Sequence, residues 1–235
     1  MKTIQLAQIS PNNDAYSETF IQNHKINFDA NVKYYYGGFL PHTLEGYGYL
    51  NDSFKDKINL RFKKLLKADF SHEELREKAL IKSFKDNNIE IVFAEYGPTG
   101  VAIMDICKQL NLPLIVNFHG YDASMLKILD LYKERYLKMF EYSYRIIGVS
   151  KTMIEKLREL GCPNEKLIYI PYGPVNGFLE LSPQYSERSF LAVGGFVDKK
   201  APYYTILAFN KVVERYPDAI LYMAGDGELY DTCIN

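Results

Sequence analysis

Residues 118–122, FHGYD, place an imidazole, a glycine and a carboxylate close together, directly after the apolar run LPLIVN at 112–117. A short apolar run bounded by turn residues is typical of a buried strand, so His119 is expected where that strand ends. An imidazole there can hydrogen-bond a ligand or move a proton, and Gly120 lets a ligand approach the main chain. A histidine that only orders a neighbouring loop fits the same position about equally well.

Polar residues also follow the other predicted strands. In an open parallel sheet, ligands bind beyond the carboxyl ends of the strands, so these residues are candidates for a site. They are residues 10–14, 95–99, 119–122, 150 and 172–173. A loop-ordering carboxylate is the alternative for Glu95 and Asp122, and a plain helix start is the alternative for Tyr96 to Thr99.

Several common chemistries lack their motifs. Gly225 and Gly227 are not followed by the third glycine of a dinucleotide fingerprint, and neither a phosphate-binding P-loop nor a G-x-S-x-G elbow occurs. The cysteines, at 107, 162 and 233, form no metal-binding cluster with histidines and are expected to be reduced thiols. The sequence therefore predicts no metal site and no bound cofactor.

The elements that position these residues alternate between strand and helix. Strands are predicted at 3–10, 32–40, 89–97, 112–118, 145–150 and 167–173, with helices at 16–28, 71–86, 98–110, 130–142 and 152–160. Capping boxes, Ser71 with Glu74 and Thr152 with Glu155, mark two of the helix starts. This alternation predicts an α/β fold with a doubly wound parallel sheet covered on both faces.

The pattern lapses at 175–188 and then restarts. A strand at 189–194, a helix at 202–216, a strand at 219–225 and the start of another helix follow. Because two strands and a helix and a half cannot enclose a core alone, they predict only the first part of a second domain. The expected organisation is a domain at 1–174, a linker at 175–188 and an incomplete domain at 189–235.

Composition and charge limit the partners. The 235 residues are 47% hydrophobic and 24% charged, as in a soluble globular protein, and the net charge of −1 argues against nucleic-acid binding. The N-terminus lacks a signal peptide pattern and no run is apolar enough to span a membrane, so a cytoplasmic protein is expected. Residues 54–68 form a basic amphipathic pattern that fits peripheral contact with an anionic membrane, although a solvated face on an inward-packing helix is favoured about two to one.

Several segments in order resemble one enzyme family. VGGFVDKKAPYYTILAF and ERYPDAILYMAGDGEL resemble the start of the donor-binding domain of glycosyltransferase family 4. SETFI at 17–21, FHGYD, the stretch from GVS to LRELGCP at 148–163 and IPYG at 170–173 resemble its N-terminal half. Within the family, the sequence is most similar to transferases that assemble colanic-acid-like exopolysaccharide and capsule.

The resemblance implies a GT-B architecture, two Rossmann-like domains, and transfer with retention at the anomeric carbon without a metal ion. The donor is then a nucleotide sugar, UDP- or GDP-linked, and the acceptor a lipid-linked saccharide at the inner face of a membrane. His119 matches the family's catalytic histidine. The donor phosphates are assigned to Gly194, Gly195, Lys199, Lys200, Gly225 and Asp226. The acceptor side is assigned to Asn12, Asn13, Ser17, Glu95, Tyr96, Gly120, Tyr121 and Asp122.

Two departures from the family pattern leave alternatives open. Gly195 stands where the family usually has arginine, and the sequence ends at Asn235, before the family's E-x7-E segment that binds donor sugar and ribose. The residues are then either the front portion of an active or split transferase, or a remnant that binds acceptor without transferring sugar. Epimerisation of a nucleotide sugar on the same fold is disfavoured by FHGYD and VDKKAP.

Overall fold

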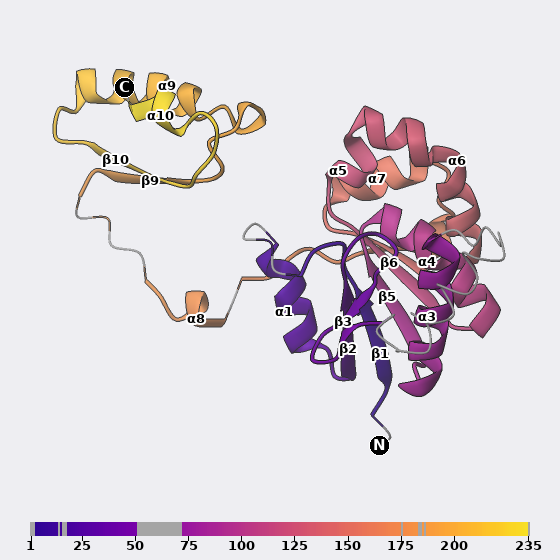
Figure 1. Ribbon diagram of the computed structural model, residues 1–235. Helices are drawn as coiled ribbons and strands as arrows, with labels where there is room; N and C mark the ends of the chain where they lie inside the picture. The colour runs from indigo at the N-terminus through magenta and orange to yellow at the C-terminus, as the bar shows by residue number, and fades with distance from the viewer. Residues whose placement is uncertain are drawn as a thin grey trace. The chain divides into compact units, whose positions relative to one another are not determined.

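A computed structural model describes residues 3–13, 15, 18–50, 72–174, 176–182, 185 and 187–234. The basic segment 54–68, the cap residue Ser71 and the predicted acceptor residue Ser17 lie outside this part of the chain. The chain divides into two compact units, residues 1–173 and 174–235, and the second contains the segment predicted as a linker. Figure 1 shows both units with most of their helices and strands labelled.

The first unit is built on one sheet with the strand order β4-β3-β2-β1-β5-β6-β7-β8. The parallel strands are β1 Gln5–Ile9, β2 Asn31–Tyr36, β5 Ile91–Glu95, β6 Leu114–Phe118, β7 Arg145–Gly148 and β8 Leu167–Tyr169. Two short antiparallel strands, β3 Thr43–Leu44 and β4 Gly48–Tyr49, extend the β2 edge. Both follow turn residues and are too short to show an apolar period in the sequence.

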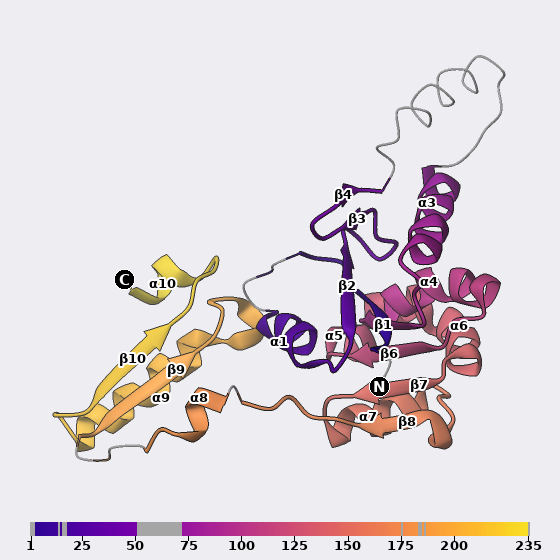
Figure 2. The same cartoon turned by 90° about the horizontal axis from the view of Figure 1, so that it is seen from below.

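Helices cover the two faces of this sheet unequally. On one face α3 His72–Asp86, α4 Gly97–Leu110, α6 Leu126–Tyr142 and α7 Lys151–Glu159 pack over strand residues such as Ala7, Val92 and Val116. The alternate strand positions, including Leu6 and Phe93, face the other side, where α1 Thr19–Asn27 lies. Figure 2 shows α1 on the opposite side of the sheet from α3, α4 and α6. The short helix α5 Tyr121–Ser124 follows β6 directly.

One predicted helix start is wrong. The sequence predicted a capping box formed by Thr152 and Glu155, but α7 begins at Lys151, and Ser150 is its N-cap. The side chain of Ser150 accepts a hydrogen bond from the backbone N–H of Met153 at 3.0 Å, which satisfies one of the free amides of the first turn. Ser150 therefore starts the helix two residues after β7 ends at Gly148.

The second unit contains two parallel strands and the helices beside them. β9 Ser189–Val193 pairs with β10 Ile220–Ala224, and α9 Pro202–Arg215 packs on one face through Phe190 and Phe209, whose ring centroids are 5.7 Å apart. The short elements are α8 Asn176–Leu179, α10 Tyr230–Ile234 and the 3-10 turn η2 Asp198–Lys200; a further turn, η1 Asn164–Lys166, belongs to the first unit. Helix α8 interrupts the stretch predicted as a linker.

Within the described residues, no helix combines the length and apolar character needed to cross a bilayer.

Candidate functional site

Three polar side chains lie on neighbouring strands of the face that α1 covers. Gln8, Glu95 and Asn117 come from β1, β5 and β6 and are 0%, 0% and 2% exposed. Glu95 and Asn117 are paired in register, so their side chains point to the same face. Because buried polar groups are costly without partners, these positions point to a network rather than to ordinary core packing.

The carboxylate of Glu95 is the centre of that network. One oxygen, Oε1, accepts hydrogen bonds from Gln8 Nε2 at 2.8 Å and meets His24 Nδ1 at 3.0 Å. The other, Oε2, meets His119 Nε2 at 2.9 Å and accepts a longer bond from Asn117 Nδ2 at 3.4 Å. Burial raises the pKa of Glu95, but the hydrogen bonds and charge interactions with His119 and His24 outweigh it and lower the pKa to about 2.

The orientation of the two amides supports an ionised Glu95. Both Gln8 and Asn117 turn their NH₂ groups toward the carboxylate, and their amide oxygens find no partner among the described residues. Leaving two buried acceptors unpaired is unfavourable, so the need of nearby acceptors for donors decides the orientation. The acceptor is the Glu95 carboxylate for both amides and, for Gln8 Nε2, also the Ile21 carbonyl oxygen at 3.1 Å.

His119 lies where the sequence placed it, at the end of β6, with a side chain only 3% exposed. Its second ring nitrogen, Nδ1, forms a hydrogen bond with the hydroxyl of Tyr172, so both ring nitrogens have partners. Phe20 stacks on the imidazole and on the Tyr172 ring, with centroids 4.7 and 4.6 Å apart, and Tyr96 lies 4.4 Å from the imidazole. An aromatic cluster therefore surrounds His119.

Asp122 fixes the backbone of the same loop. Its carboxylate is fully buried and accepts hydrogen bonds from the backbone N–H groups of Gly97, His119 and Gly120 at 2.9–3.0 Å. Burial raises the pKa of Asp122, and the amide hydrogen bonds oppose that change. Asp122 therefore connects the start of α4 to the turn after β6, and it fixes the position of the His119 backbone.

Tyr96 connects the same region to α1. Its backbone has φ 76° and ψ 142°, a conformation rare for a residue with a side chain, and strain of this kind persists only where surrounding contacts impose it. The Tyr96 hydroxyl donates a hydrogen bond to Glu18 Oε1 at 2.8 Å, and its ring lies 5.2 Å from that of Tyr121. Glu18 also accepts a bond from Asn12, at 3.0 Å.

The structure thus brings most of the acceptor-side candidates together. Asn12 and Asn13 lie beside α1 and hold Tyr34, whose hydroxyl donates to both of their carbonyl oxygens, at 2.8 and 3.3 Å. Glu95, Tyr96 and Asp122 are buried rather than open to a ligand, whereas Gly120 and Tyr121 are partly exposed.

Sequence reasoning missed His24 and Phe20. A signal was present, because Phe20, His24 and Phe28 recur at intervals of four in a predicted helix and so share one face. A histidine within an apolar stripe is buried with the stripe and needs a polar partner there. Which strand residue supplies the partner is set by the packing of α1 on the sheet, and spacing along the chain does not give it.

In the second unit, the predicted donor residues form one turn region. The Gly194 amide donates to the Ala224 carbonyl, and the Phe196 amide donates to Asp226, at 3.0 and 2.8 Å. Gly225 has φ 154°, and a Cβ built there would be 1.9 Å from the Gly194 carbonyl oxygen, so only glycine fits. Gly195, Lys199 and Lys200 are exposed, and the two lysines lie in η2.

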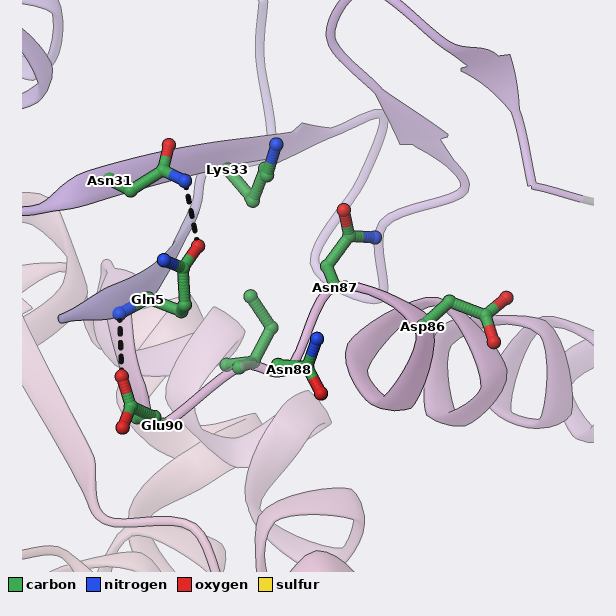
Figure 3. Close-up of a pocket in the computed structure, with 8 residues that line it drawn as sticks. Gln5, Asn31, Lys33, Asp86, Asn87, Asn88 and Glu90 are labelled. Carbon is green, nitrogen blue, oxygen red and sulfur yellow. Dashed lines mark hydrogen bonds between the residues drawn. The ribbon is translucent and has the colours of Figure 1, made fainter. Parts of the chain in front are cut away.

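A separate polar hollow of about 660 Å³ lies at the opposite edge of the first unit's sheet, at the strand starts (Figure 3). Its polar groups hydrogen-bond to one another. The Asn31 side-chain amide donates to the Gln5 side-chain oxygen at 2.7 Å, and the backbone N–H of Gln5 donates to the Glu90 carboxylate at 2.9 Å. None of the predicted site residues lines it.

Residues 55–173, just over half of the chain, match the model of the family described as Glycosyltransferase Family 4. Two curated relatives, both described as "Putative colanic acid biosynthesis glycosyltransferase WcaL", come from Escherichia coli strain K12 and Salmonella typhimurium strain LT2. Each is 27% identical over 81 residues, which are 33% of this chain and 20% of the relative. The chain therefore aligns with about a fifth of their length.

Solved structures share the fold. HepE of Anabaena, in complex with UDP and glucose, has a TM-score of 0.63 and 10% identity over 97% of this chain and 63% of its own. The lipopolysaccharide outer core galactosyltransferase WaaB has a TM-score of 0.53 and 15% identity over 98% of this chain and 63% of its own. These likenesses confirm the predicted α/β fold of GT-B type.

Proposed function

Because the chain belongs to glycosyltransferase family 4, we propose that it acts in the transfer of a sugar from a nucleotide-sugar donor to a saccharide acceptor. The observation that carries the proposal is the buried Glu95 carboxylate that holds His119 at the end of β6, within a cluster of aromatic rings. A rigidly held imidazole beside aromatic faces is suited to positioning a sugar, whose hydroxyls need hydrogen bonds and whose ring packs on apolar surface.

The reaction we propose retains the configuration of the donor sugar. The bond between the anomeric carbon and the diphosphate oxygen breaks, a bond from that carbon to an acceptor oxygen forms on the same face, and the acceptor proton leaves with the nucleoside diphosphate. Positive charge develops on the sugar and negative charge on the leaving group. His119 positions the sugar, and Lys200, with Lys199 beside it, stabilises the diphosphate as its charge grows.

The similar proteins support the donor class and the pathway type that we propose. HepE is in complex with UDP and glucose, which supports a UDP-linked donor, with a GDP-linked donor as the alternative. The relatives described as colanic acid biosynthesis glycosyltransferases support a role in polysaccharide biosynthesis. The acceptor that we propose is a lipid-linked saccharide of surface polysaccharide assembly, at the cytoplasmic face of a membrane. Of the described acceptor-side candidates, we assign to the acceptor those that are exposed or partly exposed, which are Asn12, Asn13, Gly120 and Tyr121.

A transfer assay with His119 variants tests this function. Wild-type chain is incubated with UDP- and GDP-linked sugars and lipid-linked saccharides extracted from bacterial membranes, and release of the nucleoside diphosphate is measured. We expect His119→Ala to lower kcat about 100-fold, the size of effect of one lost positioned hydrogen bond at a reacting centre. His119→Gln separates turnover from folding, because the Gln amide nitrogen replaces Nε2 in donating to Glu95 while no acceptor replaces Nδ1.

His42→Gln is the matched control. His42 hydrogen-bonds Thr43 and stacks on Tyr49, and none of these three residues belongs to the proposed site. The His42→Gln variant is expected to keep the wild-type kcat. Transfer by both His119 variants at the wild-type rate would remove His119 from the mechanism.

A further inference from the structure

Glu95 is shared by two imidazoles, and only one of them is the predicted catalytic histidine. His119 approaches Oε2 through Nε2 at 2.9 Å, and His24, from the middle of α1, approaches Oε1 through Nδ1 at 3.0 Å. The carboxylate is 0% exposed and the His119 side chain 3% exposed, so water is largely excluded from their bond, whereas the His24 side chain is 25% exposed. The two imidazoles and the amides of Gln8 and Asn117 hold it from both oxygens.

This arrangement determines which nitrogen of His119 carries the proton. An ionised carboxylate only accepts hydrogen bonds, so the nitrogen that faces it must be the N–H. In neutral His119 that nitrogen is Nε2, which leaves Nδ1 with a lone pair. The hydroxyl of Tyr172 meets Nδ1, and because burial raises the pKa of Tyr172, the hydroxyl keeps its proton and donates it.

His24 acts on the carboxylate from the other side. Without it, Oε1 keeps only the Gln8 amide as a partner, and the carboxylate is free to turn away from His119. Phe28 and Phe93 lie beside the ring of His24, at centroid distances of 6.2 and 5.9 Å, and limit its movement on those sides. The imidazole of His24 therefore restricts the rotamer of Glu95.

We propose that Glu95 and His24 are positioning residues that fix His119 as the Nε2–H tautomer, so that His119 meets the sugar as a hydrogen-bond acceptor through Nδ1. The proposal rests on the function proposed above. The Tyr172 hydroxyl marks the position of the donor on Nδ1, and a sugar hydroxyl takes that position when substrate binds. His119 is the group that touches substrate, whereas Glu95 and His24 act through it.

The tautomer has a chemical consequence. A lone pair backed by a carboxylate turns partial negative charge toward the sugar, where positive charge develops as the bond to the diphosphate breaks. A fixed acceptor also selects for a hydroxyl at the facing sugar position and disfavours a substrate that has no donor there, because Nδ1 would then be left unpaired.

Nitrogen NMR of the imidazoles tests the proposal without any substrate. The full chain is labelled with ¹⁵N-histidine, and two-bond ¹H–¹⁵N correlations are recorded along a pH series until each ring is neutral. The protein has four histidines, so His119 is assigned by comparison with His119→Gln, and His42 serves as an internal reference. We expect neutral His119 to be the Nε2–H tautomer alone.

Three variants separate positioning from folding. Glu95→Gln and His24→Leu are expected to give a mixture of His119 tautomers, while His24→Asn restores the Nε2–H form, since the Asn amide nitrogen takes the place of Nδ1. In the transfer assay, Glu95→Gln lowers kcat about 10- to 100-fold with little change in KM, the range for a lost orienting partner of an imidazole. Near-ultraviolet circular dichroism confirms the fold of each variant.

An Nδ1–H tautomer in the wild-type chain overturns the proposal, even if Glu95→Gln does not fold. A folded Glu95→Gln variant in which His119 is still the Nε2–H tautomer alone also overturns it. Because the tautomer is measured in the protein without substrate, the test of the positioning proposal is independent of the transfer activity. A chain with the expected tautomer and no transfer would contradict the proposed function and leave the positioning intact.

Discussion

At the scale of single residues, the charge of Glu95 is coupled to folding. Its pKa in the folded chain is about 2, below the ordinary value of 4.5, so the folded state favours the ionised form. Such a group contributes stability that is fully present above about pH 4.5 and is lost as the pH falls toward 2. The shift corresponds to about 3 kcal/mol at neutral pH.

We therefore expect wild-type chain to lose about 3 kcal/mol more stability than Glu95→Gln between about pH 5 and pH 2. Urea unfolding at a series of pH values measures the free energy of unfolding of both proteins. Taking the difference between them cancels the effects of the other acidic groups, which both proteins share. A constant difference across this range would mean that the histidine partners do not lower the pKa of Glu95 in the folded chain.

The sequence predicts part of this network and not the rest. Glu95 ends β5 and His119 follows the adjacent strand β6, so strand order alone places them on one edge of the sheet. The partner His24 comes from a helix, and its contact depends on how α1 packs across β1 and β5. Tyr172 was a rim candidate, but its hydrogen bond to His119 depends on the path of the chain after β8, which no local pattern specifies.

At the scale of elements, the approach of α4 to β6 depends on glycine. A Cβ built on Gly97 would be 2.5 Å from Cε1 of Phe118 and 2.7 Å from the Tyr136 hydroxyl, both of which belong to fully buried side chains. The Gly97 amide also donates to Asp122, so a shift of α4 reaches the loop that carries His119.

Gly97→Ala is expected to lower the free energy of unfolding by about 1–3 kcal/mol, because buried rings must leave their rotamers to make room. Gly173→Ala is the matched control, since a Cβ there meets nothing within 4 Å. Its effect is expected within about 0.5 kcal/mol. Equal urea midpoints for the two variants would show that the helix moves at no cost.

Prediction of helices and strands succeeds where an apolar pattern extends over a long segment. It fails where an element is short or where neighbouring side chains compete for the same role. The parallel strands and the helices of 14 residues or more follow from apolar periodicity. The strands β3 and β4 and the helix α8 are too short to show a period. The predicted start of α7 was wrong because two residues near it, Ser150 and Thr152, can each cap a helix.

At the scale of the whole molecule, each of the two units carries residues of one half of the proposed reaction. The first holds the His119 network and the second the lysines of η2. The turn between β9 and η2 depends on Gly225, which packs against the Gly194 carbonyl. The exposed Lys200 follows this turn, and the left-handed Ala201, at φ 46°, separates it from α9. The backbone thus fixes where the Lys200 side chain starts, which favours a specific anion contact over a general surface charge.

Calorimetric titration of the full chain with UDP, GDP and their sugar conjugates tests that contact. We expect saturable binding of one nucleotide series, and a rise of Kd of about 10- to 100-fold in Lys200→Ala, the effect of one lost hydrogen bond between charged groups. Lys211→Ala removes the same charge from an exposed position on α9 and is expected to bind as wild type. An equal loss in both variants would assign the effect to net charge. Undiminished binding by Lys200→Ala would mean that the diphosphate is held elsewhere, because a positioned ammonium group that contacts a diphosphate cannot be removed without a loss of affinity.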